Sequence, residues 1–251
     1  MSAILSMAQY FCLAISIGLS LFSIIVDPKY VGAGFTKLLN NLNIGSLVIL
    51  LMVSPWKMYI SPVVVAIIFL AIAPMFAEEE KKKRYFIFYA VPVAAILWSI
   101  GIFLDFSLSL DALYLFSGML YLGVITYAMI LGHWYLVVFN LSENHLKKAM
   151  VVFWALFIFK ILLSAILVGV NPKFLSFGTS QAMGYSFNWV MLLMRYIWGY
   201  IIIGVMGYYT WRLTKMRSIQ SATGVLYVMT FFVFIGELIA AYYHLNYGIS
   251  L

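Results

Sequence analysis

A glutamate lies inside the last long apolar stretch of the chain, residues 223–245. An ionised side chain in hydrocarbon costs on the order of a few kcal/mol, so Glu237 needs a partner. Residues seven apart lie two turns apart on the same face of an α-helix. The other polar residues of this stretch share that face or lie beside it: Thr223, Thr230, His244 and Tyr227. We therefore expect this helix to hold an ionisable group against another helix.

Two cationic residues lie in the two preceding apolar stretches, Lys160 and Arg195. With a rise of about 1.5 Å per residue, both reach a depth similar to that of Glu237. We hypothesise a buried ion pair between Glu237 and Arg195, with Lys160 close by. Two cations against one acid leave a net positive site unless Lys160 is neutral. Such a site suits an anion, a quinone carbonyl or a lipid phosphate; the alternative is an ion pair that only fixes the helix register.

Aromatic residues make up 18% of the chain. Trp198 follows Arg195 by three residues, so its ring is expected on the same helix face, where it could stack on the guanidinium. His133 is expected in the opposite half of the membrane, away from the cluster. His133 is either a hydrogen-bonded packing residue or a ligand contact or proton entry point. The sequence thus predicts these ligand-binding or proton-handling residues: Glu237, Arg195, Lys160, His133, Trp198, Tyr227, Thr230 and His244.

The composition indicates an integral membrane protein. Hydrophobic residues make up 65% of the chain and charged residues 9%, with a mean hydropathy of +1.05. Soluble domains carry roughly 25% charged residues. The apolar runs are continuous rather than alternating, which predicts an all-α bundle and not a β-barrel. The net charge of +7 is explained by basic loops, so no nucleic-acid partner is predicted.

The apolar runs predict one transmembrane domain, residues 1–251, with about eight spans and seven as the alternative. They run at about 3–26, 35–54, 58–77, 85–104, 112–139, 149–170, 188–211 and 223–245, each near the length a bilayer requires. The span at 35–54 is the least regular, and a re-entrant start is an alternative for it.

Basic residues divide unequally between the two sides of this layout. Eleven fall on one side: Lys29, Lys37, Lys81, Lys82, Lys83, Arg84, Lys147, Lys148, Arg212, Lys215 and Arg217. Two, Lys57 and Lys173, fall on the other. Because cytoplasmic loops are enriched in Lys and Arg, both termini are predicted outside, in a cell membrane and most simply a prokaryotic cytoplasmic membrane.

No catalytic motif is found, so catalytic residues are not predicted and enzymatic activity stays open. Cys12 is the only cysteine, which excludes an intrachain disulfide and a cysteine metal cluster, and no metal site is predicted. His133, His145 and His244 differ in expected depth, so two-histidine haem ligation is disfavoured. A haem held by one histidine is also disfavoured. The cofactor stays unknown, with a quinone as one candidate.

The leading functional prediction is a membrane subunit of an electron-transfer or respiratory assembly that holds a quinone or lipid head group at the Glu/Arg/Lys cluster. Its expected partners are the bilayer, other membrane or redox subunits, and a small lipophilic or anionic ligand. The first alternative is a proton-coupled secondary transporter, or a proton-conducting protein, that uses Glu237. The second alternative is a structural or assembly factor.

Overall fold

The described part of the chain, residues 3–26, 28–54, 56–76, 82–138 and 141–251 of a computed structural model, is built from helices and contains no strand. Its elements are α1 (Ala3–Phe22), α2 (Pro28–Val53), α3 (Trp56–Ile72), α4 (Lys82–Phe103), α5 (Leu110–Val137), α6 (Asn144–Val170), α7 (Tyr185–Tyr196), α8 (Ile202–Lys215) and α9 (Ile219–Tyr247). A π-helical segment, Ile197–Ile201, joins α7 to α8. Short 3-10 turns extend α1 and α3 and follow α6.

In the described part of the chain, six helices are long and apolar enough, by length and composition, to cross a membrane. They are Ala3–Ile25, Tyr30–Val53, Leu110–Val137, Asn144–Val170, Tyr185–Lys215 and Ile219–Tyr247. The expected spans at 58–77 and 85–104 correspond to α3 and α4, whose described apolar stretches, Ile60–Met75 and Tyr89–Phe103, are shorter. The all-helical class is confirmed, and the count of eight spans stays a prediction. The expected span ends at 77 and 139 lie outside the described residues.

The second helix begins earlier than the expected span at 35–54. Pro28 opens α2, and Gly32 interrupts its helical backbone with φ 79° and ψ 161°. A proline suits the first helical position because its missing N–H would have no partner there. Glycine adopts a positive φ without a steric penalty. The irregular start that was considered for this span is therefore a short helical turn followed by a kink at Gly32.

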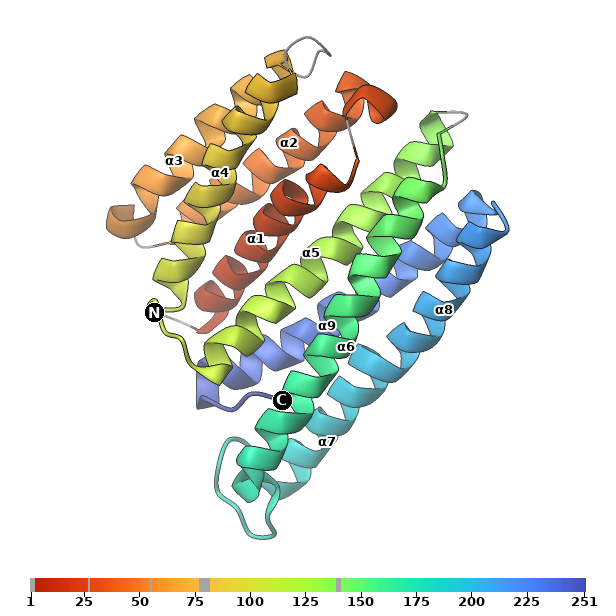
Figure 1. Ribbon diagram of the computed structural model, residues 1–251. Coiled ribbons are helices and arrows are strands. Elements are labelled where there is room, and N and C mark those ends of the chain that lie inside the picture. Colours follow the sequence, from red (N-terminus) through yellow and green to blue (C-terminus); the bar gives the residue numbers. More distant parts are fainter. Residues whose placement is uncertain (1–2, 27, 55, 77–81, 139–140) are drawn as a thin grey trace.

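The helices α1, α5 and α9 form the centre of the bundle, and α1 packs against both others. In Figure 1, α2, α3 and α4 lie on one side of this centre, and α6, α7 and α8 lie on the other. Helices α1 and α9 belong to opposite ends of the sequence, yet α1 begins and α9 ends at the same end of the bundle (Figure 1). Because α1 begins where α9 ends, the chain passes along the bundle an even number of times.

Glycine pairs lie at two helix crossings where the backbones approach closely. A Cβ on Gly18 of α1 would overlap the backbone of Gly123 on α5. At the second crossing, a Cβ on Gly236 of α9 would lie 2.8 Å from the Cα of Gly199 in the π-helical segment. Small residues let helix backbones approach closely, which is how helices associate when lipid and core are equally apolar.

Basic residues gather at one end of the bundle. Lys147, Lys148, Arg212, Lys215 and Arg217 lie near the connections from α5 to α6 and from α8 to α9, and Lys173 lies at the opposite end. An ion pair of 3.3 Å between Arg217 and Glu143 joins the two connections.

Candidate functional site

Glu237 is the centre of a wholly buried cluster. One carboxylate oxygen, Oε1, accepts a hydrogen bond of 2.8 Å from Nη2 of Arg195. The other, Oε2, accepts one of 2.9 Å from the hydroxyl of Tyr10 and lies 3.6 Å from Nζ of Lys160. These contacts bring α9, α7, α1 and α6 together around one acid, and the Glu237, Arg195 and Lys160 side chains are all 0% exposed.

Lys160 is bound mainly by α5. Its Nζ donates a hydrogen bond of 2.6 Å to the carbonyl of Tyr114 and lies 3.3 Å from the centroid of the Tyr114 ring. An ammonium group above an aromatic face is attracted by the ring quadrupole. The ion pair of Lys160 with Glu237, at 3.6 Å, is looser than the ion pair of Arg195 with Glu237, at 2.8 Å.

Arg195 is held by the π-helical segment that follows it. Its Nη2 donates to the hydroxyl of Tyr200 at 2.9 Å, and its guanidinium carbon lies 4.5 Å from the centroid of that ring. In a regular α-helix a residue five positions later lies about 140° away around the axis. The wider π turn brings Tyr200 back to the face of Arg195, and such turns occur frequently at functional sites.

Gly118 of α5 provides the space that the cluster occupies. A Cβ at this position would overlap the Glu237 carboxylate and the Tyr10 hydroxyl, and it would lie 2.8 Å from Nζ of Lys160. At the other side of the cluster, a Cβ on Gly236 would lie 2.7 Å from Nη1 of Arg195. The two glycines therefore allow ionised groups to fit between closely packed helices.

The cluster holds more hydrogen-bond donors and more positive charge than its acceptors balance. Two cations contact one carboxylate, and no other described carboxylate takes part in these ion pairs. Within the described structure, Nε and Nη1 of Arg195 and the hydroxyl of Tyr121 are buried without a hydrogen-bond partner. Buried donors without partners cost about 1–3 kcal/mol each, so they are rarely retained without a reason.

The ring that lies against the Arg195 guanidinium is that of Tyr200 and not that of Trp198, which the sequence suggested. The Trp198 ring packs against Phe232 with 5.1 Å between centroids, and the side chain is 38% exposed. Tyr200 takes the expected position against the guanidinium because the π turn rotates the following residues.

The remaining predicted site residues lie elsewhere. The Nδ1 of His133 is 2.9 Å from the Tyr227 hydroxyl, on an exposed flank between α5 and α9. The Thr230 hydroxyl donates to the carbonyl of Leu226 in its own helix. His244 bonds Ser250 at 3.1 Å, and Ser250 donates to Asp111 at 2.6 Å. Thus the polar line of α9 divides into local hydrogen bonds and a C-terminal contact, and only Glu237 enters the cluster.

Sequence reasoning missed four members of the site: Tyr10, Tyr114, Tyr200 and Gly118. Tyr10 and Tyr200 lie in apolar stretches, where a tyrosine is ordinary and gives no signal by itself. Tyr114 contributes its carbonyl and ring face, which no motif marks.

Within the described residues, no group of three or more His, Cys, Asp or Glu side chains is arranged to hold a metal ion.

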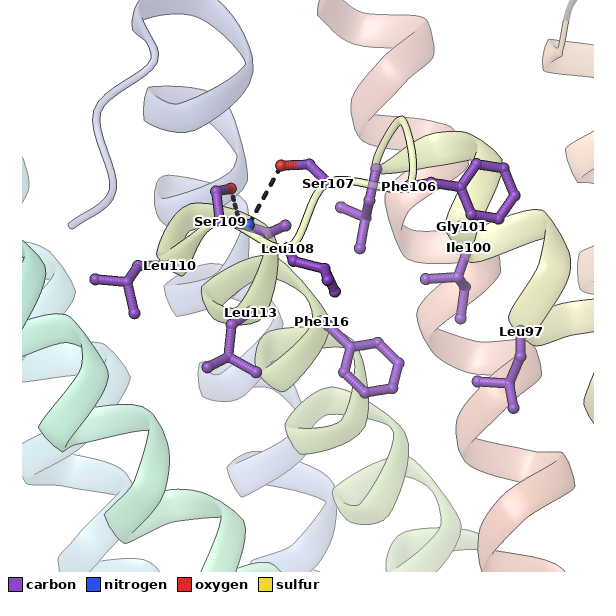
Figure 2. Close-up of a pocket in the computed structure, with 12 residues that line it drawn as sticks. Leu97, Ile100, Gly101, Phe106, Ser107, Leu108, Ser109, Leu110, Leu113 and Phe116 are labelled. Atoms are coloured by element: carbon purple, nitrogen blue, oxygen red, sulfur yellow. Dashed lines mark hydrogen bonds between the residues drawn. The ribbon is translucent and has the colours of Figure 1, made fainter.

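An apolar groove lies at the end of the bundle where α5 begins. Its volume is about 460 Å³, and it is lined by α4, α5 and their connection, with Leu97, Gly101, Phe106, Leu108, Leu113 and Phe116 among its walls. Figure 2 shows the ring of Phe116 of α5 directed towards Leu97 and Ile100 of α4. Phe103 at the end of α4 lies 6.4 Å, centroid to centroid, from the Tyr10 ring. One aromatic contact thus connects the neighbourhood of the groove to the cluster.

The fold and the site define an all-helical protein with membrane-length helices around a buried cluster of one acid and two cations. Comparison of the chain with models of protein families, with curated proteins and with solved structures finds no match. The functional argument therefore rests on the geometry of the cluster.

Proposed function

We propose that this chain is a polytopic membrane protein that acts as a proton-coupled secondary transporter of a small anion. The observation that carries the proposal is the enclosed cluster in which Arg195 and Lys160 share the single carboxylate of Glu237.

Membrane embedding is supported by the distribution of polarity. The charged side chains of the cluster are buried, whereas large apolar side chains cover the outside of the helices that enclose it. On α6, Ile158, Leu162 and Ile166 are each more than half exposed, on the other side of the helix from Lys160. A soluble protein of this size rarely exposes such continuous apolar surface, whereas lipid contact requires it.

Proton coupling follows from the charge balance. Protonation of Glu237 removes the charge that attracts Arg195 and Lys160, and their N–H donors then become available to an anion. The unpartnered Nε and Nη1 of Arg195 add further donors. A proton and an anion thereby favour each other's binding, which is the thermodynamic condition for moving together. Full burial of the cluster corresponds to an occluded state between two access routes.

The test is anion-driven proton movement in liposomes that contain only this protein and an internal pH-sensitive dye. Gradients of chloride, phosphate, acetate and lactate are imposed in turn. We expect internal acidification with at least one anion and its loss in the Glu237→Gln variant. Glu143→Gln is the matched control, because Glu143 lies outside the apolar core near the basic end. A folded Glu237→Gln protein with unchanged proton flux would contradict the proposal, and variants that differ only in stability would favour a structural role.

The apolar groove supports a second candidate function, a membrane subunit that holds a quinone or lipid. The groove suits a lipophilic ligand. Phe103, which precedes the lining residue Leu104, packs near Tyr10, and Tyr10 donates to Glu237. Purification from the native host in mild detergent distinguishes the candidates. Attached redox subunits and extractable quinone support the subunit, whereas a lone protein with flux in liposomes supports the transporter.

A further inference from the structure

A second site lies at the basic end of the bundle, far along α6 from the charge cluster. A pocket of about 950 Å³ is formed there where the end of α1 and the start of α2 face the start of α6. We call it the basic pocket; its lining includes Tyr30, His145, Lys147 and Lys148, with Ile25, Val151 and Val152 on its apolar side. We propose that the basic pocket binds the phosphate head group of an anionic phospholipid, independently of the proposed transport.

The positive charge of the pocket is not fully neutralised. Glu143 pairs with Lys147 at 3.3 Å and with Arg217 at 3.3 Å. A backbone hydrogen bond and then Lys147 hold the pKa of Glu143 below its usual range, so this carboxylate stays charged near neutral pH. Lys148 is exposed and has no ion pair with a described carboxylate. Three cations against one acid leave a surplus that attracts an anion.

The apolar part of the pocket indicates a lipid rather than a free anion. Ile25, Val151 and Val152 continue the lining from the lysines towards the apolar surface of the bundle, and Val151 is 55% exposed. Tyr30 is 61% exposed, and its ring lies 5.7 Å from the His145 ring, centroid to centroid. A phosphate diester at Lys147 and Lys148 would leave its acyl chains along the valines. Basic pockets between helices on the cytoplasmic side are suited to such head groups.

The experiment measures binding of dioleoyl phosphatidylglycerol to the full chain in detergent by native mass spectrometry. Dioleoyl phosphatidylcholine and inorganic phosphate are the comparison probes. We expect phosphatidylglycerol to bind about tenfold more tightly than phosphatidylcholine, because Lys147 and Lys148 attract its net negative charge. Millimolar phosphate should not displace it.

The double variant Lys147→Gln/Lys148→Gln is expected to lose most of this preference. Lys215→Gln is the matched control, because Lys215 is an exposed base at the same end that packs on Trp211, outside the pocket. Circular dichroism confirms that each variant is folded. Equal binding of the two lipids, an unchanged preference in the double variant, or displacement by inorganic phosphate would each overturn the proposal.

Discussion

Donor groups from three other helices stabilise the carboxylate of Glu237 in an apolar core. Arg195, Tyr10 and Lys160 each approach one of its oxygens. Removing one member of a buried ion pair leaves an uncompensated charge, which is more damaging than removing both. The contribution of the pair is therefore measured by comparing single and double substitutions.

We predict that Glu237→Gln and Arg195→Gln each lower the free energy of unfolding by about 3–5 kcal/mol. The double variant should lose clearly less than the sum, because its glutamines leave no unpaired charge. Reversible unfolding in mixed micelles measures all four proteins. Losses that add within error would show that the two side chains act independently and would contradict the ion pair.

Gly118 makes a prediction about space rather than charge. In Gly118→Ala, the methyl group would overlap the Glu237 carboxylate and the Tyr10 hydroxyl. We expect this overpacking to lower the free energy of unfolding by about 1–3 kcal/mol and to weaken the proton flux. Gly169→Ala on α6 is the control, since a Cβ there meets nothing within 4 Å. That variant should be neutral or slightly stabilising in the same unfolding assay.

Helix crossings and the π-helical segment decide which residues meet. The π turn at Ile197–Ile201 places Arg195 and Tyr200 on one face, and Gly199 in the same segment lies against Gly236 of α9. The pairing of Gly18 with Gly123 brings α1 close to α5, and from the same helix α1 Tyr10 donates to Glu237 of α9. The cluster therefore depends on backbone approach at two crossings.

Gly18→Ala tests the crossing of α1 and α5. Its Cβ would meet backbone atoms of Gly123, which cannot rotate away as a side chain can. We expect the free energy of unfolding to fall by at least about 3 kcal/mol, at the upper end of overpacking effects. We also expect a reduced proton flux, because Tyr10 is displaced. Thermal unfolding of Gly18→Ala is compared with that of Gly45→Ala, whose Cβ meets nothing within 4 Å. Equal stability of the two variants would show that the crossing is adaptable.

The molecule as a whole combines a mostly apolar core, in which three charged side chains are buried, with many large apolar side chains on its outside. Its basic connections lie at one end, and the loop that contains Lys173 lies at the other. Because Lys and Arg are enriched in cytoplasmic loops, the basic end is expected to face the cytoplasm.

Cysteine labelling in intact cells tests this orientation. In a Cys12→Ser background, a cysteine is introduced by Ser180→Cys in the loop before α7 or by Ser221→Cys at the basic end, both exposed positions. An impermeant maleimide should label the first protein in intact cells and the second only after permeabilisation. The reverse pattern would invert the orientation, and labelling of both in intact cells would argue against a membrane-spanning arrangement.

The sequence by itself determined the class of fold and the three charged members of the cluster. Long apolar runs predict helices whatever their neighbours are, and ionised groups within them are so costly in hydrocarbon that a shared site is expected. The charge of a side chain and its expected depth in the membrane can both be read from the sequence. Together they were enough to select Glu237, Arg195 and Lys160. Their role in function remains a prediction that the flux assay addresses.

Tertiary structure alone decided which uncharged residues complete the site and which polar residues do not. Helical periodicity gives the face of a side chain but not the helix that it meets. Tyr10 reaches Glu237 across 227 positions of sequence, Tyr200 replaces Trp198 because a π turn shifts the register, and Gly118 matters only through what lies opposite it. His133, Thr230 and His244 carry the same polar signal as Glu237, but they bond other partners: His133 bonds Tyr227 of α9, Thr230 bonds its own helix, and His244 bonds Ser250. Contacts between distant helices depend on backbone approach, which becomes defined only when the whole bundle is packed.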